Sequence, residues 1–287
     1  MIIRQTELIA DHSQSTGGLA VRARLLRVAL VLLVGLSATA AGWQRPAQAA
    51  ETRMVRVAAA ADLKVAFGDI IATFQQQNPD IKVEVTYGSS GNFYSQLSSR
   101  APFDLFLSAD VDYPKRLVEQ GFTQADSGFA YAIGGLVMWV RNASPIPVEK
   151  LGIDALLDTS VQKIAIANPR HAPYGRAAEA AMKRLGVYDK AKDRLVYGEN
   201  IIQTAQFVES GAADIGLISH SLAVAPPLRD KGRSWEVPLD AYPPLEQGGV
   251  ILSWARDRLA VEALRRFILE DAGKEILRRY GFRLPGE

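Results

Sequence analysis

The stretch IKVEVTYGSSGNFYSQLSS (residues 81–99) joins a strand-like run to a helix-like run through a short polar loop at residues 88–92. Apolar and polar residues alternate before the loop, which predicts a strand, and helical spacing of apolar residues from Phe93 predicts a helix. A loop that ends at a helix N-terminus directs backbone N–H groups to one point, and with small hydroxyls beside them it forms an anion site. Residues 55–76 repeat this order, with Ala61 and Asp62 in the loop.

The rest of the chain continues the alternation of short apolar runs and amphipathic stretches, which predicts an α/β fold with mostly parallel sheets. The strand-like runs are 55–60, 81–86, 105–108, 135–140, 163–167, 215–218 and 250–254. The helix-like runs are 63–76, 93–99, 113–120, 176–185, 202–210 and 258–268. Glycine pairs at 134–135 and 248–249 are compatible with hinges between two lobes and equally with simple turns.

The N-terminal region has the order of a secretory signal peptide. Arg22, Arg24 and Arg27 precede an uninterrupted apolar run at 28–34, and Ala-Gln-Ala ends at Ala49, so we expect cleavage after Ala49. The apolar run is shorter than the ~20 residues of a membrane span. The chain has no cysteine, which excludes disulfides and a lipid-modified cysteine. These features predict a soluble periplasmic protein without a lipid anchor.

The net charge of +2 belongs partly to this leader, because residues 1–49 contain five arginines and two acidic residues. The remaining chain has 28 basic and 29 acidic residues and no run rich in Lys or Arg. We therefore expect no nucleic-acid partner.

Four loops carry the candidate chemistry: 61–62, 89–91, 172–175 and 199–201. Each follows a strand-like run or a loop after one, and each precedes a helix, so they can converge on one cleft at the carboxyl ends of the strands. Simple helix capping explains any one of them, because Asp62 and Asn200 are favoured N-caps and Pro173 is a favoured first-turn residue. Four such loops together favour a binding site.

These loops offer hydroxyls and N–H groups but no obligatory Lys or Arg. Each charge-assisted hydrogen bond contributes roughly 1.5–3 kcal/mol, so several of them can offset the desolvation of a dianion. A cage of fixed neutral donors suits a tetrahedral oxyanion.

Five segments together resemble the periplasmic molybdate-binding (ModA) family. They are VAAAADL (57–63), GSSG (88–91), APFDLFLSAD (101–110), NPRHAPYG (168–175) and RYGF (279–282). The resemblance covers residues 54–282 and implies a two-lobed type II periplasmic binding protein fold with the ligand cleft between the lobes. It also implies a monomeric, non-enzymatic receptor that captures molybdate, and often tungstate, and delivers it to the membrane permease of an ABC importer.

The resemblance also implies the oxyanion ligands, and the two apparent chain crossings, at 134–135 and 242–249, predict the domain limits. After a leader at 1–49, lobe 1 would comprise 50–134 plus 246–287, and lobe 2 would comprise 135–245. The family's ligand positions fall on Ala61, Asp62, Ser90, Tyr174 and Ile201. No cofactor is implied, and molybdenum enters only inside the bound anion, without direct protein ligands.

Asp62 departs from the family pattern, in which Ser, Thr or Asn is common at this position. A carboxylate facing the pocket would repel a dianion. We expect Asp62 to lend only its backbone N–H to the anion while its side chain caps the following helix.

Other chemistry-bearing residues have plainer explanations. His171, beside Arg170, could lie at a cleft rim, but we expect an ordinary solvated loop. Asp104, Asp110 and Asp112 are expected to cap strand ends, since a calcium loop would require a Gly and a terminal Glu. His-based metal sites and a conventional catalytic triad have no support in the sequence.

Two alternatives remain open. A phosphate or sulfate receptor would use the same donors, and Asp62 favours phosphate because protonated phosphate is recognised by an acceptor. A periplasmic serine hydrolase would use Ser90 as its nucleophile, although residues 88–91 lack the G-x-S-x-G spacing of a nucleophile elbow.

Overall fold

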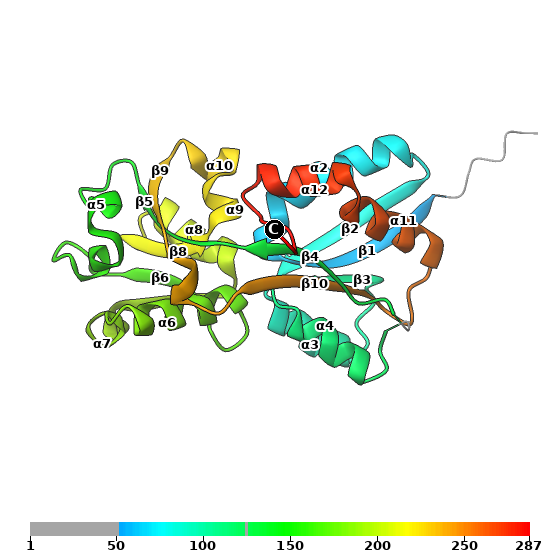
Figure 1. Ribbon diagram of the computed structural model, residues 1–287, viewed down its shortest axis with the longest axis horizontal. Coiled ribbons are helices and arrows are strands. Elements are labelled where there is room, and N and C mark those ends of the chain that lie inside the picture. Colours follow the sequence, from blue (N-terminus) through cyan, green and yellow to red (C-terminus); the bar gives the residue numbers. More distant parts are fainter. Residues whose placement is uncertain (1–51, 124–125) are drawn as a thin grey trace, which may run out of the picture. The chain divides into compact units, whose positions relative to one another are not determined.

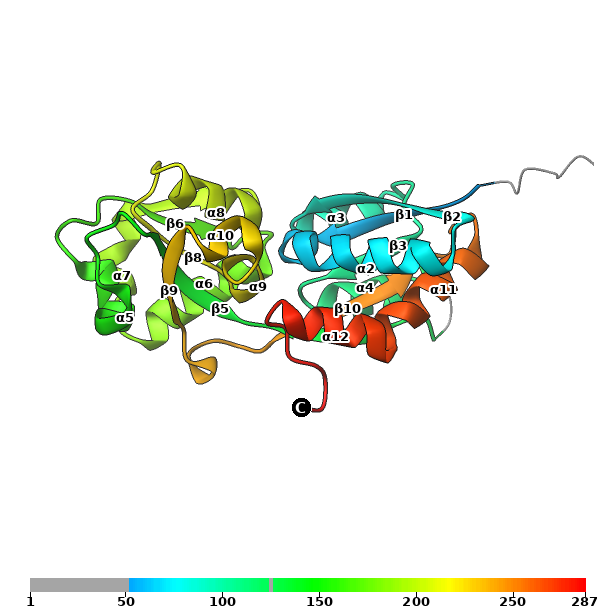
Figure 2. The ribbon, with the colours of Figure 1, turned by 90° about the horizontal axis from the view of Figure 1, so that it is seen from above.

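The computed structural model describes residues 52–123 and 126–287. The expected leader at 1–49 lies outside these residues. Within them the strands form two five-stranded sheets, each with helices around it (Figures 1 and 2). No helix in the described ranges is long and apolar enough to cross a membrane.

Sheet 1 has the strand order β2-β1-β3-β10-β4. Its strands are β1 (Arg53–Ala60), β2 (Ile81–Gly88), β3 (Leu105–Ser108), β4 (Phe129–Gly134) and β10 (Leu245–Ile251). Its helices are α2 (Lys64–Gln77), α3 (Ser90–Ser98), α4 (Asp112–Glu119), α11 (Arg258–Leu269) and α12 (Asp271–Arg279), with the short 3₁₀ helix η1 (Ala61–Leu63) after β1. Helices α2, α11 and α12 lie on one face of the sheet, and α3 and α4 lie on the other (Figure 1).

Sheet 2 has the order β7-β6-β8-β5-β9. Its strands are β5 (Leu136–Arg141), β6 (Ile164–Ala167), β7 (Leu195–Gly198), β8 (Ile215–Ser219) and β9 (Gly232–Glu236). Its helices are α5 (Val148–Leu151), α6 (Pro173–Arg184), α7 (Tyr188–Ala191), α8 (Ile201–Glu209), α9 (His220–Ala223) and α10 (Pro226–Arg229). The 3₁₀ helices η2 (Gly152–Leu157), η3 (Lys192–Arg194) and η4 (Leu239–Ala241) complete it.

The α/β class is confirmed, but the sheets are mixed instead of mostly parallel. In sheet 1, β1 pairs in parallel with β2 and β3, whereas β10 runs antiparallel to β3 and β4. In sheet 2, β6 pairs in parallel with β7 and β8, whereas β5 runs antiparallel to β8 and β9. Strand–helix–strand units give the parallel pairs, and the strands that leave one sheet for the other give the antiparallel pairs.

The chain passes between the sheets at two places. Strand β4 ends at Gly134 and β5 begins at Leu136, and the return runs from the end of β9 to the start of β10. The first glycine pair therefore lies at a crossing, whereas Gly248 and Gly249 lie inside β10, next to a bulge. A Cβ on Gly249 would lie 2.6 Å from the Phe129 ring. Close packing therefore explains why glycine is present at 248–249, and no hinge is needed there. The lobe limits themselves stay a prediction.

Candidate functional site

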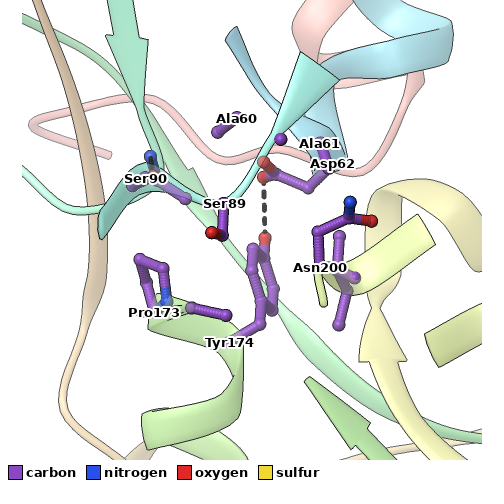
Figure 3. A pocket seen from close by; sticks show the side chains of 12 residues that line it. Ala60, Ala61, Asp62, Ser89, Ser90, Pro173, Tyr174 and Asn200 are labelled. Atoms are coloured by element: carbon purple, nitrogen blue, oxygen red, sulfur yellow. Dashed lines mark hydrogen bonds between the residues drawn. The ribbon is translucent and has the colours of Figure 1, made fainter. Parts of the chain in front are cut away.

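A small cavity lies where loops after strands of both sheets meet (Figure 3). It is lined by Ala60, Ala61, Asp62, Gly88, Ser89, Ser90, Ala109, Ala172, Pro173, Tyr174, Asn200 and Ile201. All five residues that the sequence placed at an oxyanion site are in this set, and each of the four predicted loops contributes to it. Ligand contact by these residues stays a prediction.

Three helices begin at this cavity. Ser90, Pro173 and Ile201 are the first residues of α3, α6 and α8. Asn200 caps α8, since its Oδ1 accepts hydrogen bonds from the N–H groups of Ile202 at 3.0 Å and Gln203 at 3.1 Å, and Pro173 occupies the first turn of α6 as expected. The first N–H groups of a helix have no intrahelical partner. Asn200 already accepts from two of those in α8, and Pro173 has no N–H, so the feature that the three ends share here is the positive end of the helix dipole.

Ser90 is oriented by a hydrogen bond that leaves its proton available. Its Oγ accepts from the Ala109 N–H at 2.9 Å, and the residue is 1% exposed. A hydroxyl has one donor and two acceptor positions, so the O–H can point to a bound anion. No hydrogen bond joins Ser90 to a histidine in the described part of the chain.

His171 is less exposed than expected for a solvated loop. It is half-buried, its Nδ1 is 3.0 Å from Ser89 Oγ, and its carbonyl accepts from the Gly91 N–H at 2.9 Å. A Cβ on Gly91 would lie 2.7 Å from that carbonyl oxygen. His171 does lie in the loop before α6, but it is only partly exposed because this loop packs directly on the start of α3.

Asp62 does not cap its helix. The N-cap of η1 is Ala60 and that of α2 is Leu63, and neither has a side-chain cap hydrogen bond. The Asp62 carboxylate instead turns to Tyr174, whose hydroxyl donates to Oδ2 at 3.0 Å (Figure 3). The Gln247 amide donates to the same oxygen. The interposed 3₁₀ turn moves the start of α2 away from Asp62, and this explains why the expectation failed.

Burial governs the electrostatics of this carboxylate. Asp62 is 2% exposed, and burial raises its pKa to about 6, although the hydrogen bonds from Gln247 and Tyr174 oppose the shift. Burial, followed by the nearby Asp62 charge, raises the pKa of Tyr174 well above its ordinary value. Tyr174 is therefore a donor throughout the physiological pH range.

Gln247 and Tyr131 complete this part of the site and were missed from the sequence. Tyr131 Oη lies 2.9 Å from Gln247 Oε1, which orients the Gln247 amide nitrogen toward Asp62. Both residues are buried, on β10 and β4 respectively. No local motif marks them, because β4 gave no strand signal and the expected β10 began five residues too late.

Comparisons with known proteins agree with the family resemblance that the sequence motifs indicated. The family described as bacterial extracellular solute-binding protein matches residues 55–283. The chain belongs to this family. The molybdate-binding protein ModA of Rhodobacter capsulatus is 37% identical over 254 residues, which cover 88% of this chain and 94% of that protein. ModA of Azotobacter vinelandii is 37% identical over 260 residues, which cover 91% and 98%.

A solved structure agrees with these relatives. The periplasmic molybdate-binding protein of Azotobacter vinelandii superimposes with a TM-score of 0.74 at 32% identity, covering 80% of this chain and 99% of that chain. The chain is thus a ModA-family solute-binding protein, and the resemblance drawn from its motifs is confirmed.

In this ModA-family chain the cavity is small. Its volume is about 10 Å³, close to the minimum that one water molecule needs. Hydrogen bonds that involve residues outside its lining also join the elements around the two sheets: Ser221 Oγ donates to the Asp62 carbonyl at 2.9 Å, and Asn92 Nδ2 donates to Glu199 at 2.8 Å. A four-oxygen anion therefore requires the walls to move apart.

The described residues contain no group of His, Cys, Asp or Glu that could hold a metal ion. Asp104 serves structure, because its Oδ2 accepts from the Arg56 N–H at 2.8 Å and its Oδ1 from the Arg256 N–H at 3.0 Å. Asp110 forms an ion pair with Arg176. Asp104 thus holds the start of β3, as predicted for a strand end, whereas Asp110 lies in an ion pair and Asp112 is the first residue of α4.

Proposed function

We propose that this protein is a periplasmic receptor that captures molybdate, with tungstate as an analogue of the same shape, and delivers it to the membrane permease of an ABC importer. The observation that carries the proposal is the meeting of three helix N-termini and the Ser90 hydroxyl around one cavity. None of the twelve residues that line the cavity is Lys, Arg or His. Neutral, fixed donors bind a dianion through many hydrogen bonds of moderate strength.

The names of the relatives support this choice of anion, because the similar chains from Rhodobacter and Azotobacter are molybdate-binding proteins. The proposal includes action as a monomer, with no cofactor and no catalysis. Molybdenum is held only through the oxygens of its anion, by Ala61, Asp62, Ser90, Tyr174 and Ile201.

A hydrogen phosphate receptor is the second candidate, and Asp62 is the observation that favours it. A buried carboxylate acceptor suits an anion that still carries a proton near neutral pH. Sulfate brings no proton, and Asp62 gives it no corresponding advantage.

Calorimetric titration of the mature protein with molybdate, tungstate, sulfate and phosphate tests the choice. We expect molybdate and tungstate to bind at least about a hundredfold more tightly than sulfate and phosphate, a difference of about 2.7 kcal/mol. Tighter binding of phosphate than of molybdate would overturn the proposal in favour of the second candidate.

A further inference from the structure

One oxygen of Asp62 is left without a donor. Oδ2 accepts from Tyr174 and Gln247, whereas Oδ1 is buried and has no hydrogen-bond partner among the described residues. Asp62 itself lines the cavity. Buried polar atoms are nearly always paired in folded proteins, so an unpaired carboxylate oxygen in the wall of a binding cavity requires an explanation.

The surroundings of Asp62 supply no positive charge. The side chains around it include Tyr174 from α6, Gln247 from β10, Tyr131 from β4 and Ser221 from α9. The backbone N–H groups of Asp62 and Leu63 also act on the carboxylate and lower its pKa. All of them are neutral at ordinary pH. A dianion entering beside an ionised Asp62 would therefore place three negative charges in one buried cavity, and like charges in such a site disfavour joint ionisation.

We propose that the anion complex contains one proton, shared between Asp62 Oδ1 and an oxygen of the bound anion. This inference rests on the proposed function and specifies how the same site accepts its ligand. The proton gives Oδ1 its missing partner and lowers the negative charge in the cavity from three to two, which reduces the repulsion. A fully deprotonated anion such as molybdate must take this proton from solvent, whereas hydrogen phosphate brings its own.

The ionisation of free Asp62 sets the direction of the pH dependence. Its pKa of about 6 means that the carboxylate is mostly ionised in the free protein above this pH. Molybdate binding there takes up a proton, so the affinity falls by about tenfold for each pH unit, up to the pKa of the complex. Below about pH 6 the free carboxyl is already protonated, and this dependence disappears.

The test is calorimetric titration of the mature protein with sodium molybdate at about pH 8, in two buffers of different ionisation enthalpy. The difference between the two observed enthalpies counts the protons taken up. We expect a value near one per anion, together with about tenfold weaker binding at pH 8 than at pH 7.

Two variants locate the proton. Asp62→Asn should bind molybdate with no proton uptake and with an affinity that does not change between about pH 6 and 8. Asp110→Asn is the matched control, because this carboxylate lies near the same cavity but is already paired with Arg176, and its proton uptake should remain near one. Circular dichroism establishes whether both variants are folded. If a variant is not folded, the number of protons that the wild-type protein takes up still decides the proposal.

The outcomes separate the two proposals. Tight molybdate binding with no proton uptake at about pH 8 and with constant affinity would overturn the shared proton and leave the receptor function intact. Proton uptake that persists in Asp62→Asn would also overturn it, because another group would then be the acceptor. Absence of molybdate binding at every pH tested would instead overturn the proposed function.

Discussion

A carboxylate lies near each end of β1, and the two differ in whether a cation is paired with them. At the first end, Arg53 Nε lies 2.6 Å from Asp257 Oδ2, and this hydrogen bond lowers the pKa of Asp257 to about 2. At the other end, Asp62 is buried without a cation, and its pKa is raised to about 6. The paired carboxylate stabilises the fold, whereas the unpaired carboxylate costs stability at the site where an anion is expected. A charge left uncompensated inside a cavity is a mark of function.

The largest expected effect is at Asp62. Its folded pKa of about 6 lies above the ordinary 3.8, so its contribution to stability is fully present below about pH 4 and is lost as the pH rises through 6. Asp62→Asn should therefore be more stable than wild type by up to about 3 kcal/mol above pH 6, since two pKa units correspond to roughly that energy. Urea unfolding across this pH range measures the difference. Equal stabilities at about pH 8 would contradict the contrast between the two ends of β1.

Ser90, after the neighbouring strand β2, provides a neutral donor beside the Asp62 charge. Ser90→Ala should weaken molybdate binding by roughly 1–3 kcal/mol if its hydroxyl makes a charge-assisted hydrogen bond. Ser95→Ala is the control on the same helix, because that residue is exposed and its hydroxyl donates to the Gly91 carbonyl. Calorimetry compares the variants, and unchanged affinity in Ser90→Ala would remove this side chain from the site.

Gly134 tests whether the Asp62 end depends on tight packing. A Cβ there would lie 2.2 Å from Tyr174 Oη and 2.9 Å from Gln247 Nε2, the two donors to Asp62. Gly134→Ala should destabilise the protein by roughly 1–3 kcal/mol through overpacking. Gly68→Ala is the matched control, since no atom lies within 4 Å of its Cβ, and in the interior of α2 it should stabilise by roughly 0.5–1 kcal/mol. Similar unfolding midpoints for both variants would show that the donors can shift freely.

The smallest expected change in stability is at the end of β1 where Asp257 is paired with Arg53. Asp257→Asn should cost about 0.5–1 kcal/mol at neutral pH, because the ion pair is partly exposed and Asn can still cap α11. The depressed pKa of Asp257 means that its contribution is present above about pH 4 and is lost as the pH falls through 2. Unfolding at neutral and acid pH measures both values. If the stability difference between wild type and Asp257→Asn grew as the pH fell, the stabilising role assigned to the Asp257 carboxylate would be wrong.

The strands missed from the sequence share one position in the fold. Strands β4, β7 and β9 each lie at a sheet edge. The alternation that marks a strand in sequence comes from burial of its faces, and edge strands such as β9, GRSWE, are only partly buried. The central strands β1, β3, β6 and β8 are mostly buried and were all predicted within a few residues.

By itself the sequence determined the α/β class and the positions of the loops at the cavity. These follow from local patterns, such as the change from alternating to helical spacing around residues 88–92. The tertiary structure alone decided what Asp62 does. Its donors Tyr174 and Gln247 lie 112 and 185 residues away along the chain. Capping by Asp62 was the best local interpretation, but burial and distant partners set the direction of its side chain and its pKa, and neither leaves a signal in neighbouring residues.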